Sequence, residues 1–469
     1  MKRAAIAAAL FAAGCTSVGP DYKRPTIELP AEYTAPAAQS EAELSAQWWT
    51  LYGDATLNKL VDAAQASNTD IRLAAARVQE AEAVWREARA SLFPEITGAY
   101  SYTRSHVSSR TIPPPIGGFA LTRPQYQAII STTFELDFWG RLARASEAAQ
   151  ANLLATRYAQ DVTALTLAGA TAQTYLGLRS LDAQITVLAQ TIAARSESLE
   201  LARTRLQAGL SSELDVHQAQ GALSDALVQQ REAARQRAVL ERQLGQLTGQ
   251  LDLKLVPGDL FALPVPPTPP AGLPSTLLTR RPDIRSAEES LVAANAQIGV
   301  ARAALFPTIS LTAALGAQSA AFADLLASGS GIWTLGYAAA LPIFDAGRRT
   351  ARVEQAEARE RQALVGYQRS IETAFREVSE GLINVAETGA AEADLATRLQ
   401  AARNALELSN ERYRAGYSPY LEVLDAQRTA NEAELAFVRN RQARLAFSVD
   451  LMKALGGGWT DPTRLGSEH

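Results

Sequence analysis

Residues 125–138 alternate between apolar and mostly polar side chains with a period of two. Successive side chains of a β-strand point to opposite faces, so the alternation predicts a strand with one apolar face. About ten residues with this pattern are typical of a strand in a membrane β-barrel. Three further segments follow the pattern more loosely, at 96–105, 309–318 and 332–344.

Each of these segments taken alone also fits a soluble hairpin that covers a helix. The four segments, however, form two pairs at corresponding places of a repeated sequence, which favours a common barrel. Two of them carry aromatic side chains of the kind found at membrane interfaces. These residues are Tyr100, Tyr102, Trp333 and Tyr337.

Long stretches rich in Ala, Arg, Glu and Gln, with almost no Pro and few Gly, predict very long helices. The two longest would be rods of about 100 Å at ~1.5 Å per residue. Each rod breaks at a glycine, Gly209 or Gly416, and returns as a second helix, so apolar stripes must pack laterally as in a coiled coil. Long helices are expected over 141–207, 213–248, 348–414 and 420–455, and shorter ones over 55–91 and 283–304.

The chain contains two copies of one unit. At an offset of 213, residues 70–98 align with residues 283–311, and 13 of 29 positions are identical. At an offset of 207, residues 199–220 align with residues 406–427, and 11 of 22 positions are identical. Such self-similarity is the sequence signature of tandem structural repeats.

The duplication sets the predicted domain organisation. The mature N-terminus and the linker between the copies are rich in proline and are therefore expected to be extended. The predicted segments are a signal peptide at 1–14, an extended segment at 15–54 that begins an equatorial domain, a first repeat at 55–248, a Pro-rich equatorial linker at 249–282, a second repeat at 283–456 and a C-terminal tail at 457–469.

Composition excludes several classes of function. Charged residues make up 20% of the chain and the net charge is -4, so the protein is not a polybasic nucleic-acid binder. One cysteine and three histidines leave no disulfide framework and no Cys/His metal site. The sequence lacks a phosphate loop and a Gly-x-Ser-x-Gly motif, and His217 has no nucleophile partner. We therefore expect no catalytic residues, no cofactor and no metal.

Residues 1–14 contain two cations, a short apolar stretch and then small residues, which is the arrangement of a secretory signal. Cys15, the single cysteine, follows directly, and the junction resembles the bacterial lipoprotein cleavage box, although Ala12 stands where leucine is commonest. This predicts lipidation of Cys15; the alternative is an ordinary signal peptide with an incidental cysteine. Thr16 in place of aspartate favours the outer membrane over retention in the inner membrane.

Four strands per chain cannot close a membrane barrel, because closed barrels begin at eight strands and open edges are not stable in lipid. Several chains must therefore share one barrel, eight strands for a dimer or twelve for a trimer. Only the larger barrel leaves a lumen that side chains would not fill. A barrel that continues into a tube of long helices is a conduit.

Four motifs carry a resemblance that covers nearly the whole mature chain. Together they resemble the TolC-type outer-membrane factors (outer membrane efflux proteins), in the lipoprotein branch typified by OprM and NodT. The resemblance implies a mainly α-helical chain with a membrane β-barrel, in a homotrimer with a shared twelve-stranded barrel, an α-helical periplasmic barrel and a mixed equatorial domain. The motifs are CTSVGPDYKRP at 15–25, WWTLYGDATLNKLV at 48–61, GLPSTLLTRRPDIRSAE at 272–288 and RYRAGYSPYLEVLDAQ at 412–427.

The resemblance also implies a function. Such proteins are exit ducts of tripartite efflux pumps, anchored in outer-membrane lipid and coupled to a periplasmic adaptor and an inner-membrane transporter, commonly of the resistance-nodulation-division type. Drugs or other small toxic compounds are the expected cargo. The rival hypothesis is a structural or adhesive coiled-coil surface protein without channel activity, which would not need four alternating strands.

In this family a tyrosine on the second hairpin bonds to an aspartate on the first and closes the tube. The resemblance assigns these roles to Tyr413 and Asp215, and a deeper ring of carboxylates to Glu422 and Asp425. An alternative is that these acids are solvated first-turn residues favoured by the helix dipole. An arginine that TolC itself carries after the tip glycine is replaced here by Ser418, so a clamp is absent or comes from a neighbour, with Arg205, Arg412 and Arg414 as the candidates.

The adaptor is expected to dock on the hairpin turns, whose glycines allow a partner helix to approach closely. A role as simple helix caps is equally compatible with the same glycines. The docking residues predicted on this basis are Gly209, Ser211, Gly416 and Ser418.

Overall fold

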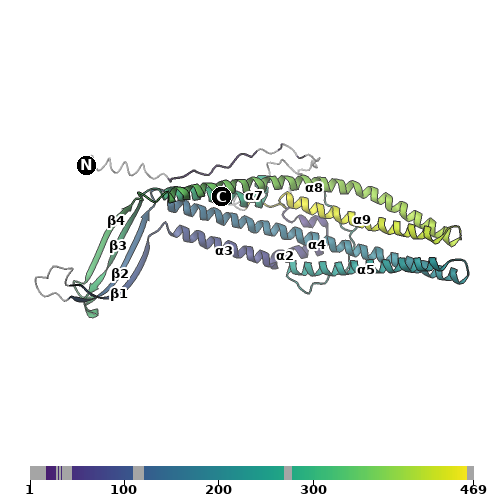
Figure 1. Ribbon diagram of the computed structural model, residues 1–469, viewed down its shortest axis with the longest axis horizontal. Helices are drawn as coiled ribbons and strands as arrows, with labels where there is room; N and C mark the ends of the chain where they lie inside the picture. Colours follow the sequence, from purple (N-terminus) through teal and green to yellow (C-terminus); the bar gives the residue numbers. More distant parts are fainter. Residues whose placement is uncertain are drawn as a thin grey trace. The chain divides into compact units, whose positions relative to one another are not determined.

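A computed structural model of the protein describes residues 17–27, 30, 33, 45–108, 121–268 and 277–461 (Figure 1). The predicted signal peptide and Cys15 lie outside these residues. The chain divides into two compact units that each draw on both sequence copies. One unit comprises Val78–Thr156 and Ala287–Tyr367 with the N-terminal residues up to Thr26, and the other comprises Ile27–Arg77, Arg157–Ser286 and Gln368–His469.

Four antiparallel strands form a single sheet in the order β1-β2-β3-β4 (Figure 1). Each copy contributes one pair, and β2 joins β3 across the two copies. β4 ends four residues earlier than predicted, since Pro342 has no N–H to donate to a strand ladder. The strands are β1 at Glu95–His106, β2 at Thr122–Leu136, β3 at Thr308–Ser319 and β4 at Gly331–Ala340.

The register gathers the large apolar side chains on one face of the sheet. Ile130 lies opposite Leu315, which lies opposite Trp333, and all three side chains are exposed, Trp333 to 77%. The neighbouring row on the opposite face pairs Thr97 with Ser131. The period-two pattern of the sequence is thus confirmed as one apolar and one mostly polar face. The apolar face further includes Ile96, Tyr100, Tyr102, Tyr126, Phe134, Leu311, Leu335 and Tyr337.

Four long helices have the predicted bounds to within a residue. Helix α4 (Arg141–Gln207) and helix α5 (Glu213–Thr248) form one hairpin, and helix α8 (Arg348–Arg414) and helix α9 (Tyr420–Ala454) form the other (Figure 1). No helix in the described part of the chain is long and apolar enough to cross a membrane. The short elements are η1 at Trp48–Tyr52, α6 at Leu277–Arg280, α7 at Pro282–Ala303 and η3 at Phe322–Asp324.

The helix expected over 55–91 is in fact two helices, α2 (Ala55–Ser67) and α3 (Thr69–Ala90). Asn68 between them is extended, and its side-chain oxygen accepts a hydrogen bond of 2.7 Å from the backbone N–H of Asp70. Its amide group donates to the carbonyl of Leu247 at 2.9 Å. Asparagine ends the first helix because its side chain caps the second, which is a common use of this residue.

The second unit has an aromatic core beneath the Pro-rich linker. Trp48 and Tyr52 are fully buried and pack with residues of α2, α4, α5 and α9 and with Leu260 of the linker. The linker is also held by Asp182, a buried carboxylate that accepts from Arg237 at 2.5 Å and from the backbone N–H of Gly258 at 3.0 Å. A buried charge is tolerated only when it is paired in this way.

Candidate gate at the helical hairpin turns

Both hairpin turns are closed by a glycine in the left-handed region. Gly209 has φ 74° and Gly416 has φ 82°. At each turn the glycine N–H and the following N–H bond back to carbonyls of the helix, with N···O distances of 2.8–3.0 Å. This is the Schellman arrangement that ends helices, and it favours glycine for its backbone alone. The next residues, Leu210 and Tyr417, are exposed to 69% and 81% respectively.

Tyr413 is the centre of a small apolar cluster at the turns. Its side chain is buried, with 4% exposed, and its ring lies 5.5 Å from that of Tyr420 between ring centroids. All four long helices contribute to the cluster, so Tyr413 joins the two hairpins within one chain. The other buried members are Leu199 and Ala202 of α4, Ala219 of α5 and Val423 of α9.

The direct bond between Tyr413 and Asp215 that the resemblance implies is not made within this chain. Asp215 instead accepts a hydrogen bond of 2.9 Å from the hydroxyl of Ser211. The Tyr413 hydroxyl is buried and has no hydrogen-bond partner among the described residues. Burial raises the pKa of Tyr413 above its ordinary value; Arg205 and the nearby Ser211 hydroxyl oppose this rise, whereas the negative charge of Asp215 adds to it.

Both candidates for the carboxylate ring are paired with arginine. Glu422 lies 3.2 Å from Arg412 of the preceding helix, and Asp425 lies 2.8 Å from Arg428, one turn further along α9. All four side chains are largely exposed, so each pair contributes only ~0–1 kcal/mol. Arg428 could have been identified from the sequence, because it follows Asp425 by three residues and such positions are neighbours on a helix.

The predicted clamp candidates fall into two groups. Arg412 and Arg414 form exposed ion pairs, with Glu422 and with Glu197 respectively. Arg205 instead lies over the Tyr413 ring, with 4.7 Å between its guanidinium carbon and the ring centroid. Ser418, which stands where the family resemblance implies an arginine, is buried and its hydroxyl has no partner in the described part of the structure.

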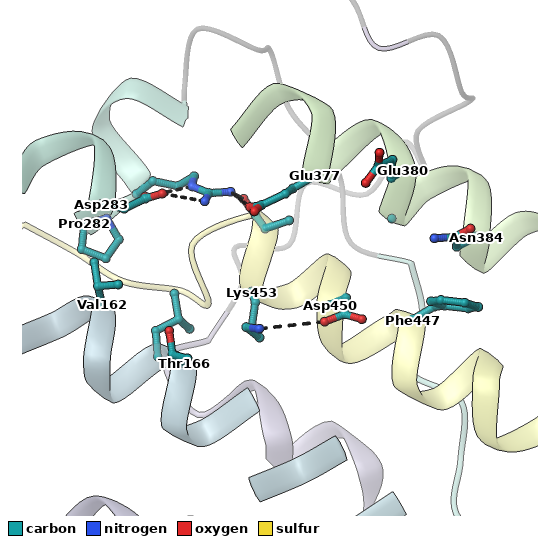
Figure 2. Close-up of a pocket in the computed structure, with 14 residues that line it drawn as sticks. Val162, Thr166, Pro282, Asp283, Glu377, Glu380, Asn384, Phe447, Asp450 and Lys453 are labelled. Atoms are coloured by element: carbon teal, nitrogen blue, oxygen red, sulfur yellow. Dashed lines mark hydrogen bonds and ion pairs between the residues drawn. The ribbon is translucent and has the colours of Figure 1, made fainter. Parts of the chain in front are cut away.

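A pocket of about 390 Å³ lies elsewhere in the same unit, among α4, α7, α8 and α9 (Figure 2). Its charged groups compensate one another: Arg281 lies 2.7 Å from Asp283 and 2.8 Å from Glu377, and Lys453 lies 3.9 Å from Asp450. Among the residues that the structure describes, no group of His, Cys, Asp and Glu could hold a metal ion. We interpret this pocket as packing between helices.

A four-stranded sheet with an apolar face that the described residues leave exposed, together with two long helical hairpins, defines the class of the TolC-like outer-membrane channels, which confirms the predicted fold class. The chain belongs to the outer membrane efflux protein family, whose sequence profile matches residues 60–250 and 273–457.

Relatives in sequence cover almost the whole chain. The solvent efflux pump outer membrane protein SrpC of Pseudomonas putida is 36% identical, with 97% of each chain covered. The cation efflux system protein CusC of Escherichia coli O6:H1 is 33% identical, with 96% of this chain and 97% of CusC covered.

Solved structures of outer-membrane channels share the fold of this chain. The outer-membrane channel OprN has a TM-score of 0.88 at 28% identity, covering 94% of this chain and 99% of OprN. The open state of the MtrE outer membrane channel of Neisseria gonorrhoeae has a TM-score of 0.86 at 29% identity, covering 95% of this chain and 99% of MtrE. The protein is therefore an outer-membrane exit duct of an efflux pump, and the hypothesis of an adhesive coiled coil is not supported.

Proposed function

We propose that three copies of the chain form one duct through the outer membrane. The observation that carries this proposal is the apolar face of the sheet, which none of the described residues covers. β1 and β4 are the edge strands of the sheet, and unpaired edges are unstable in lipid. The sheet of one chain therefore has to pair with sheets of other chains to close a barrel. Three chains of four strands each give a twelve-stranded barrel whose polar face lines a lumen.

The oligomer can be tested with the full-length protein extracted from outer membranes in mild detergent. We expect a mass of three chains and a band on denaturing gels that migrates differently before and after heating, as compact barrels do. A single chain mass with unchanged migration would contradict the shared barrel.

We propose a periplasmic adaptor and a transporter of the resistance-nodulation-division type as the partners, with small toxic compounds as the cargo. The names of the relatives support a role in an efflux pump and a varied cargo, since SrpC is named for solvent efflux and CusC for cation efflux. The hairpin turns at Gly209, Ser211, Gly416 and Ser418 are the proposed docking surface. The exposed side chains that follow the two glycines there support docking of another protein.

Lipid attachment at Cys15 is proposed as the anchor. Val18, three residues after Cys15, supports this because its N–H donates a hydrogen bond of 3.0 Å to the carbonyl of Trp139, just after β2. The chain that follows Cys15 is thus held at the end of a strand of the proposed barrel. Further along, Arg24 forms a two-bond ion pair with Glu288 of α7, at 2.6 and 2.7 Å. Palmitate labelling of the mature protein should be lost in Cys15→Ala; labelling that persists would disprove this anchor.

The gate is proposed at Asp215, Tyr413, Glu422 and Asp425. It is supported by the burial of Tyr413 between the hairpins and by the proximity of Asp215, whose charge acts on its hydroxyl. Removing both polar groups in Tyr413→Phe with Asp215→Ala should raise the single-channel conductance and admit large antibiotics. Unchanged conductance and unchanged antibiotic entry would contradict a gate at these residues.

A further inference from the structure

Arg205 makes two separate contacts with one residue of the other hairpin. It lies in the last turn of α4, and its guanidinium stacks over the ring of Tyr413 at 4.7 Å. Its Nη1 also donates a hydrogen bond of 2.7 Å to the backbone carbonyl of Tyr413. That carbonyl, which also accepts a hydrogen bond of 3.0 Å from the N–H of Gly416, lies in the last turn of α8, where helix carbonyls carry partial negative charge.

We infer that Arg205 is a positioning residue that latches the two hairpins together and keeps the gate at Tyr413 closed. This inference rests on the proposed gate. A cation over an aromatic ring and a donor to a helix-end carbonyl both favour the same placement of α8 against α4. Movement of one hairpin tip away from the other breaks both contacts at once.

The internal repeat provides a comparison within the same chain. Arg412 is the equivalent of Arg205 at an offset of 207, but the equivalent of Tyr413 in the first copy is Leu206. Arg412 therefore has no ring to stack on in that position and pairs with Glu422 of its own hairpin at 3.2 Å. Of the two equivalent arginines, Arg205 contacts the other hairpin and Arg412 pairs within its own.

The latch lies next to a proposed docking turn. A Cβ atom added at Gly416 would lie 4.0 Å from Nη2 of Arg205, the one contact within that distance among the described residues that do not adjoin Gly416. The Nε of Arg205 is shielded from solvent and has no hydrogen-bond partner among the described residues. A partner helix that approaches Gly416 meets this guanidinium and competes with Tyr413 for it, which couples docking to release of the gate.

The test is the open probability of single channels formed by the full-length trimer. Arg205→Met keeps the length and apolar stem of the side chain but removes the charge and the donors. We expect its open probability to rise about fivefold, from the loss of one cation–π contact and one hydrogen bond. The matched control Arg412→Met should change it far less, and Arg205→Lys, which keeps the charge, should restore part of the closure.

A second variant guards against a folding defect. Tyr413→Leu copies the residue that the first copy tolerates at the equivalent position, and it should open the channel to a similar extent. Adding Arg205→Met to Tyr413→Leu should then have a smaller effect than Arg205→Met has in the parent, because the ring contact is already lost and only the hydrogen bond to the backbone carbonyl at position 413 remains. A merely structural arginine would give additive changes. An Arg205→Met trimer with the open probability of the Arg412→Met trimer would overturn the latch.

The outcome can be separated from a failure of the gate itself. If the Tyr413→Phe and Asp215→Ala variant opens the channel and Arg205→Met does not, the latch is wrong and the gate stands. If neither variant changes the open probability, the gate lies elsewhere.

Discussion

Tyr413 gives the hairpin turns a stability that their surface charges do not supply. Its ring is buried among side chains from four helices, and burial of an aromatic ring stabilises a structure by about 1.5–3 kcal/mol. The ion pairs at Glu422 and Asp425 are exposed and weak by comparison. We therefore expect closure to depend on packing around Tyr413 and only slightly on salt concentration.

The pairing of Asp425 with an arginine leads to a prediction about the ion selectivity of the channel. Arg428 lies 2.8 Å from Asp425 and offsets its charge, so Arg428→Gln should leave three uncompensated carboxylates in a trimer. The reversal potential in a potassium chloride gradient should move toward cation selectivity. Arg235→Gln, which breaks the similar exposed pair with Glu232, is the control and should leave the potential unchanged. Equal shifts in both variants would show that Asp425 does not face the conduction path.

Asp54 makes a prediction about acid stability. Burial alone would raise its pKa, but hydrogen bonds from the Tyr175 hydroxyl and from the N–H groups of Thr56 and Leu57 leave its pKa below the ordinary value. A carboxylate with a lowered pKa in the folded state contributes stability above its unfolded pKa of about 4 and loses it as the pH falls through the folded value. Asp54 also caps α2, so Asp54→Ala should cost about 1 kcal/mol at pH 7.

Denaturant unfolding of the detergent-solubilised protein, followed by circular dichroism at pH 7 and pH 3, measures this contribution. The difference between Asp54→Ala and the parent should shrink at pH 3. Asp62→Ala, an exposed change in the same helix, is the control. A difference that is as large in acid as at neutral pH would contradict the assigned role of the carboxylate.

Site residues were predictable from sequence only where a motif or a local spacing marks them. Asp215, Tyr413, Glu422 and Asp425 were named through the family resemblance, and their gate role stays a prediction. The stacking of Arg205 on a residue 208 positions away could not be predicted, because it depends on how two hairpins pack. Sequence reasoning could only name it as one of three candidate arginines.

Helices and strands were predicted best where Gly or Pro residues in the sequence mark their ends. The four long helices begin and end within one residue of the predicted bounds, because Gly209, Gly416 and the Pro-rich linker interrupt otherwise uninterrupted helical sequence. The break at Asn68 was missed, since neither Gly nor Pro marks it. A strand run to Phe344 was also wrong, although Pro342 in the sequence is a signal that ends a ladder.

The hairpin turns make a prediction that separates docking from capping. Valine at Gly209 and Gly416 is strained at positive φ and adds bulk where a Cβ meets open space or only Arg205. Export of antibiotics by cells should be abolished while the amount of trimer in outer membranes stays the same. Gly366→Val, in a helix interior with open space around it, is the control. Loss of the trimer in the turn variants would instead favour simple helix caps.

In the whole molecule, each sequence copy supplies one pair of strands and one long helical hairpin. One copy contributes β1, β2 and the α4–α5 hairpin, and the other contributes β3, β4 and the α8–α9 hairpin (Figure 1). The copies are joined where β2 pairs with β3 and where the turns meet at Tyr413. The sequence could predict the two copies and their strands, and the family resemblance placed a meeting of the hairpins at Tyr413. The pairing of β2 with β3 could not be predicted, because it is made by residues far apart in the chain.

The most direct test of the duct is the conductance of the purified full-length protein in planar lipid bilayers. The account predicts discrete single-channel steps from the wild-type oligomer, which become larger or more frequent in the Tyr413→Phe and Asp215→Ala variant. An intact oligomer that inserts into the bilayer and gives no steps, in the wild type and in the variant alike, would contradict it.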